Sequence, residues 1–138
     1  MANVIYPKFK EALMGGEADV SLNSNSDTTG VFVALLKSTY VYSSSHLYYS
    51  ELSGHIIGTP VRIPNCTVTN GVLDGDDVTF TAVPADTVEK IVLYRKNTGA
   101  DSTWRLVAYF DSGLGNVPYT TDGSNLPVQF NPSGILKL

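Results

Sequence analysis

Three apolar runs, each ended by a turn, dominate the hydrophobic pattern of residues 76–110. Residues 78–83 alternate between apolar and polar side chains with a period of two, which is typical of a half-buried strand. Residues 90–95 and 104–110 are β-branched and aromatic runs, joined by a loop rich in turn-forming residues. These last two runs predict an antiparallel hairpin. We expect the three strands to form a meander at the centre of the fold, with the rest of the chain covering its apolar face.

The N-terminal region carries a helical pattern. In residues 6–14 apolar side chains recur every three to four positions, Pro7 suits the first turn, and Gly15-Gly16 is a typical helix end. Such a short helix is unstable alone, so we expect it to dock on the sheet. A continuous apolar run at residues 31–36 predicts a strand buried on both faces.

Shorter elements are predicted elsewhere in the chain. Residues 45–53 fit a second short helix, which Gly54 limits. Asn70-Gly71 is a strong turn pair, although its flanks need not form a tight hairpin. Extended segments are expected at residues 18–22, 59–72, 126–130 and 135–138. Because the last of these is apolar, we expect it to pair into a sheet rather than fray.

Many short strands separated by turns predict an all-β, mainly antiparallel fold, either a β-sandwich or a jelly-roll-like arrangement. The short N-terminal helix and the second helix near residues 45–53 would be its only helical parts. The 138 residues suit a single domain that spans residues 1–138.

Charge narrows the range of partners. Charged residues make up 16% of the chain, which is below the usual quarter, and the formal net charge is −4. No run of Lys and Arg forms a basic stripe, so we expect no nucleic-acid partner. No apolar run approaches the length of a membrane span, and the first residues do not resemble a signal peptide. We therefore expect a protein made in the cytoplasm, without a membrane partner.

Candidate chemical groups are few. Asp74, Asp76 and Asp77 resemble the start of a calcium loop, but the glutamate expected at the twelfth position is missing, which favours a solvated turn. His46 and His55 do not have the spacing of metal-binding histidines on a helix. The chain has one cysteine, which excludes an internal disulfide and favours a buried structural thiol. Without a nucleophile or phosphate-binding motif, we expect no enzyme, metal or cofactor.

The tyrosines give a less specific indication of function than a catalytic motif would. They gather near three consecutive serines, and Tyr with Ser is favoured at recognition surfaces because it offers large contact area at low entropy cost. The alternative is that two or three of these rings pack in the core. The candidate partner-binding residues are Tyr40, Tyr42, Tyr48, Tyr49 and Tyr119.

The chain also resembles a family of small structural proteins of tailed bacteriophages, which includes capsid cement (decoration) proteins. The resemblance extends over nearly the whole length, and its motifs are structural rather than catalytic. It is carried by residues 6–16, 31–36, 69–83 (TNGVLDGDDVTFTAV), 91–95, 102–111 (STWRLVAYFD) and 130–138 (FNPSGILKL).

This resemblance implies a non-enzymatic virion protein with a β-sandwich or jelly-roll fold. Such a protein is expected on the outer surface of the assembled capsid, as a dimer or trimer that bridges neighbouring major capsid proteins. It would be made in the host cytoplasm. The alternative function is a tail- or connector-associated adaptor, or a receptor- or glycan-binding module that uses residues 40–49.

Overall fold

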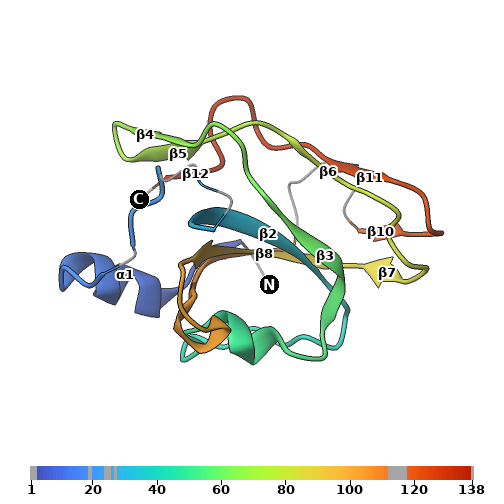
Figure 1. The fold of residues 1–138 in the computed structure, drawn as a ribbon, viewed down its shortest axis with the longest axis horizontal. Helices are drawn as coiled ribbons and strands as arrows, with labels where there is room; N and C mark the ends of the chain where they lie inside the picture. The colour runs from blue at the N-terminus through green and yellow to red at the C-terminus, as the bar shows by residue number, and fades with distance from the viewer. Residues whose placement is uncertain (1–2, 19, 24–25, 27, 112–117, 138) are drawn as a thin grey trace.

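A five-stranded antiparallel sheet forms the centre of the structure, in the order β1-β9-β8-β2-β3 (Figure 1). The computed structural model describes residues 3–18, 20–23, 26, 28–111 and 118–137. The strands of this sheet are β1 (Val4–Ile5), β2 (Gly30–Leu36), β3 (Ile56–Arg62), β8 (Lys90–Lys96) and β9 (Arg105–Phe110).

The sequence pattern of the central strands follows from their position. All residues of β2 are buried, as predicted, because β8 and β3 flank it and other segments cover both faces. The predicted hairpin of β8 and β9 is confirmed, with a register shift between Leu93 and Tyr94. β3 carries Pro60 and lies at an edge of the sheet, where the missing N–H of proline is tolerated.

The predicted three-strand meander is wrong. β6 (Val78–Phe80) pairs with β11 (Leu126–Val128) in a sheet of its own. β8 has no edge left for β6, because β9 and β2 occupy both of its sides. Between β6 and β8 the chain forms β7 (Thr87–Val88), which pairs with β10 (Tyr119–Thr120).

A three-stranded sheet contains β4 (Thr67–Thr69), β5 (Val72–Asp74) and β12 (Leu136–Lys137). Asn70 and Gly71 have φ angles of 53° and 77°, so β4 and β5 do form a tight hairpin, closed by a turn with two left-handed residues. The C-terminal segment pairs with β5, which confirms the prediction that it enters a sheet. Figure 1 shows this sheet and the β6–β11 pair on the same side of the five-stranded sheet.

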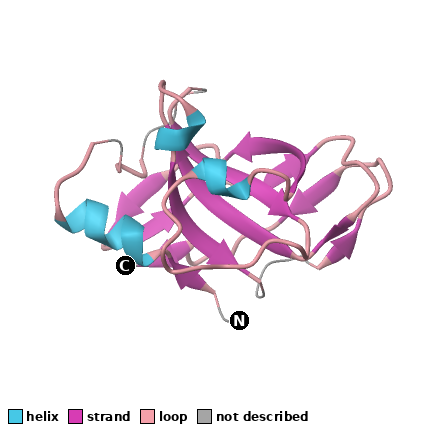
Figure 2. Ribbon diagram, turned by 90° about the horizontal axis from the view of Figure 1, so that it is seen from below, coloured by secondary structure: helices cyan, strands magenta, loops and turns pink. Residues whose placement is uncertain are grey.

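Figure 2 looks onto the other side of the five-stranded sheet, where the short helical turns lie, and shows the longer helix at one end of the molecule. The predicted first helix is α1 (Pro7–Met14), whose buried residues are Phe9 and Ala12. The predicted second helix is the short 3₁₀ turn η1 (Tyr49–Leu52), and a further 3₁₀ turn, η2 (Asp101–Thr103), precedes β9. At η1 the carboxylate of Glu51 accepts a hydrogen bond from the backbone N–H of Tyr48, at 2.9 Å.

A strand was predicted at residues 18–22, but none forms in the described part of this segment. Asp19 lies outside the described residues. Instead, the buried Leu22 anchors the segment, and the carbonyl of Ser21 accepts a hydrogen bond from Nε of Arg95 at 2.6 Å. The buried guanidinium of Arg95 therefore has a hydrogen-bond acceptor, which a buried charged group requires.

The all-β, mainly antiparallel class is thus confirmed, whereas the assignment to a sandwich or a jelly roll stays a prediction. One hydrophobic cluster joins Phe9 of α1 to the buried apolar residues of the five-stranded sheet and to those of β5, β6 and β11. No helix in the described ranges is long and apolar enough to cross a membrane.

Candidate functional site

The first aromatic cluster lies in the core, where β1, β9 and the segment after β2 meet. The Tyr40 hydroxyl lies 2.7 Å from the Tyr6 hydroxyl and 2.8 Å from Nδ1 of His46. Tyr42 packs between Tyr6 and Tyr109, with ring centroids 5.2 and 5.3 Å away. Tyr6 and Tyr40 are 0% and 1% exposed.

Burial controls the protonation of these phenols. It raises the pKa of Tyr40 to about 12 and also raises that of Tyr6, whose neutral form the hydrogen bond to Tyr40 favours further. Both hydroxyls therefore stay protonated at neutral pH. They serve as hydrogen-bonding groups of the core rather than as acid–base groups.

A second aromatic cluster stacks against the same sheet. Tyr94 lies parallel to Trp104, with centroids 5.9 Å apart, and Tyr49 packs against both rings. Lys96 places its Nζ 5.0 Å from the centre of the Trp104 ring and 5.1 Å from that of Phe32, within the range of cation–π attraction.

The five tyrosines predicted to bind a partner therefore fall into two groups, one in the core and one that reaches the surface. Tyr40 is corrected to a core residue, because its ring and its hydroxyl are both engaged inside the protein. Tyr42, Tyr48 and Tyr49 are partly buried, and Tyr119 on β10 is 41% exposed. Residue type and clustering do not separate these cases, since tyrosine suits both a core and a contact surface. Partner binding by the four that reach the surface stays a prediction.

Each carboxylate of the acidic turn accepts a hydrogen bond within the fold. Asp74 accepts from the N–H of Gly75 at 2.9 Å, Asp76 from the amide of Asn65 at 2.7 Å, and Asp77 from the N–H of Phe130 at 2.9 Å. The carboxylates thus connect the start of β6 to two neighbouring segments. Nowhere in the described residues do three His, Cys, Asp or Glu side chains gather as a metal site would require.

The two histidines and the cysteine also have partners within the fold. Nδ1 of His55 lies 2.8 Å from the hydroxyl of Thr39. Cys66 is buried, its thiol donates to the carbonyl of Ile63 at 3.3 Å, and burial raises the pKa of the thiol to about 11. A thiol in this state is a poor nucleophile at neutral pH.

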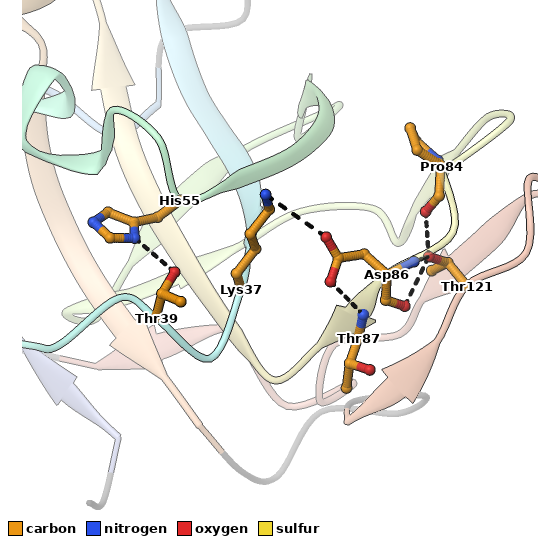
Figure 3. A network of polar contacts seen from close by, with 7 residues as sticks. All are labelled: Lys37, Thr39, His55, Pro84, Asp86, Thr87 and Thr121. Atoms are coloured by element: carbon orange, nitrogen blue, oxygen red, sulfur yellow. Dashed lines mark hydrogen bonds and ion pairs between the residues drawn. The ribbon is translucent and has the colours of Figure 1, made fainter.

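A polar network joins the loop before β7 to the end of β10 (Figure 3). The buried hydroxyl of Thr121 donates to the carbonyls of Pro84 and Asp86 and accepts from the N–H of Asp86 at 2.9 Å. In the figure the side chains of Lys37 and Asp86 point toward each other, and they form an ion pair at 3.8 Å. These contacts fix the β7–β10 pair, whose two strands come from distant parts of the chain.

A candidate binding surface that the sequence did not indicate is a groove. One part has a volume of about 450 Å³ and lies between the edge strands β1 and β12. A second part of about 350 Å³ continues over α1 and shares Ile5, Lys10 and Lys137 with the first. The remaining lining residues are Asn3, Val4, Ala108, Phe110, Ile135 and Leu136 in the first part, and Leu13 and Met14 in the second.

Exposed apolar side chains extend this groove. Met14 at the end of α1 is 82% exposed, and Val68 on β4 is 48% exposed. Leu13 lines both the second part of the groove and a neighbouring hollow that Val68 also lines. Large exposed apolar side chains beside a groove are typical of a protein-binding surface.

No protein-family model matches the chain, and no curated protein or solved structure matches it.

Proposed function

We propose that this chain is a non-enzymatic structural protein of a bacteriophage virion, which binds the outside of the assembled capsid and bridges neighbouring major capsid proteins. The observation that carries the proposal is the groove between β1 and β12, with the exposed Met14 at its end. The resemblance of nearly the whole chain to small phage virion proteins supports the same function. The partner is the major capsid protein, and the protein acts as a dimer or trimer on the capsid surface.

The mechanism is stabilisation by selective binding. A protein that binds the mature lattice, and not its precursor or its free subunits, stabilises that lattice by mass action. Contacts to several subunits at once add avidity, so each interface needs only modest affinity. The low content of charged residues suits such a surface, because charge is depleted at the cores of interfaces.

Co-sedimentation tests this function. The purified protein is mixed with expanded empty capsids, with unexpanded precursor capsids and with isolated tails of the phage that encodes it. We expect it to pellet with expanded capsids alone and to raise the temperature at which they open. Binding to tails but not to capsids would overturn the proposal.

One observation favours a second function, a receptor- or glycan-binding module or a tail adaptor. A hollow of about 340 Å³ is lined by Tyr49, Asp101 and polar residues of the η1 region. Partly exposed rings beside polar groups suit sugar binding. A glycan-array signal that Tyr48→Ala and Tyr49→Ala both abolish, while each variant is still folded at the assay temperature, would favour this function over the capsid role.

A further inference from the structure

The outer edge of β1 offers backbone groups for pairing. The N–H of Tyr6 donates to the carbonyl of Val107 at 3.0 Å, so this facing pair exchanges hydrogen bonds with β9. In an antiparallel ladder such pairs alternate with pairs that do not exchange bonds. Ile5 faces Ala108, one position along, so its N–H and C=O point away from β9. β1 is the last strand of its sheet, and Ile5 lines both parts of the groove.

The opposite wall of the groove is also a sheet edge. β12 is the last strand of the three-stranded sheet and contributes Leu136 and Lys137 to the lining. Between the two walls lie the apolar side chains of Phe110 and Ile135. An extended segment placed along β1 would bury alternate side chains here, since successive residues of a strand point to opposite faces.

Charge defines what this segment must carry. Lys10 and Lys137 are the two cations that line both parts of the groove. The side-chain ammonium of neither lysine forms a hydrogen bond or an ion pair with any of the residues that the structure describes. In a chain with a net charge of −4 these two ammonium groups form a local positive site. A carboxylate is the group that complements them.

We propose that this groove binds an extended peptide segment of a partner protein as an additional strand beside β1. The segment carries apolar side chains at alternate positions and one carboxylate, which lies between Lys10 and Lys137. Main-chain hydrogen bonds to Ile5 supply affinity, and the apolar pocket and the two lysines supply specificity. In the capsid this segment belongs to the major capsid protein, and this last assignment rests on the proposed function.

A peptide titration of the full chain tests the groove directly. The probe is the acetylated, amidated peptide Ile-Thr-Glu-Thr-Ile, added to isotopically labelled protein and followed by NMR. We expect shifts of the backbone amide of Ile5 and its neighbours. Replacing Glu in the peptide by Gln, or testing the K10Q/K137Q protein, should weaken binding by about fivefold, the scale of one exposed charge pair.

Two controls make the result decisive. Lys8→Gln removes a lysine of the same helix that is already paired with Glu11 at 2.9 Å, so binding should not change. Methylation of alternate backbone nitrogens of the peptide should abolish binding, because it removes the ladder donors. Equal binding of the methylated peptide, shifts remote from Ile5, or no binding at millimolar concentrations would overturn the strand proposal.

Capsid binding separates this inference from the proposed function. If K10Q/K137Q pellets with expanded capsids as well as the unchanged protein does, the two lysines do not contact the capsid, and the capsid role stands. If the peptide binds the groove but the protein never pellets with capsids, the groove stands and the capsid role fails.

Discussion

The hydroxyls of Tyr6 and Tyr40 lie 2.7 Å apart in the core, and they join the segment before α1 to the segment after β2. The Tyr40 hydroxyl is the central group, because it also lies 2.8 Å from Nδ1 of His46. Two regions far apart in sequence are thus connected through one oxygen atom.

Tyr40→Phe should destabilise the fold by about 1–3 kcal/mol, because it leaves the buried hydroxyl of Tyr6 without its partner. Tyr6→Phe should cost less, about 1 kcal/mol, because Tyr40 keeps His46. Urea unfolding of the single and double variants measures these differences, and the double variant should cost less than the sum. Tyr119→Phe, on the surface, is the control. Equal effects of the two core variants would contradict the central role of Tyr40.

Thr121→Val should destabilise the protein by about 1–3 kcal/mol, because its buried hydroxyl bonds the backbone of Pro84 and Asp86. Thr120→Val is the matched control, since Thr120 is exposed on β10 and should change stability by no more than about 0.5 kcal/mol. Thermal unfolding of both variants gives the comparison. A control that is as costly as Thr121→Val would show that the strand, and not the hydroxyl, is responsible.

Removal of residues 135–138 should lower the unfolding temperature, because Leu136 and Lys137 pair with β5 and Ile135 is buried. Ile135→Ala alone should cost about 2–4 kcal/mol, as expected for a buried isoleucine. Lys137→Ala, which changes an exposed side chain, should have little effect on calorimetric stability. Unchanged unfolding after the truncation would mean that the segment is a free arm.

Alkaline pH should destabilise the protein. Burial raises the pKa of the Cys66 thiol from 9.0 to about 11, so between these values the unfolded chain has lost a proton that the folded chain retains. The stabilisation is complete below about pH 9 and declines as the pH rises toward 11, with Tyr40 contributing at higher pH. Urea midpoints from pH 7 to 11 measure the decline, which should be shallower in Cys66→Ala. Parallel profiles for the two proteins would exclude the thiol as a cause.

The local elements were predictable because their signals are local. The run in β2 is apolar at every position, since the strand is central and covered on both faces. α1 begins at Pro7, because proline is tolerated in the first turn of a helix. After the helix, Gly16 has a φ of 67°, which glycine adopts readily. The pairing of β6 was not predictable, because an alternating strand fits any edge that offers it an apolar surface.

The candidate site shows the same division. The tyrosines were visible as a composition feature, yet the burial of Tyr40 and Tyr42 depends on contacts with Tyr6 and Tyr109, which belong to other parts of the chain. The groove had no local signal at all. Lys10 and Lys137 come from opposite ends of the sequence and line one surface only because β1 pairs with β9 and β12 pairs with β5.

The sequence by itself determined the all-β class, the single helical segment of the first residues and the turn at Asn70-Gly71, because side-chain periodicity and backbone preference act over a few residues. The tertiary structure decided which strand edges pair and which tyrosines are buried. It also decided where two lysines line a groove beside the edge strand β1. Those outcomes depend on burial of apolar surface between distant segments, and that free energy is defined only once the segments are in contact.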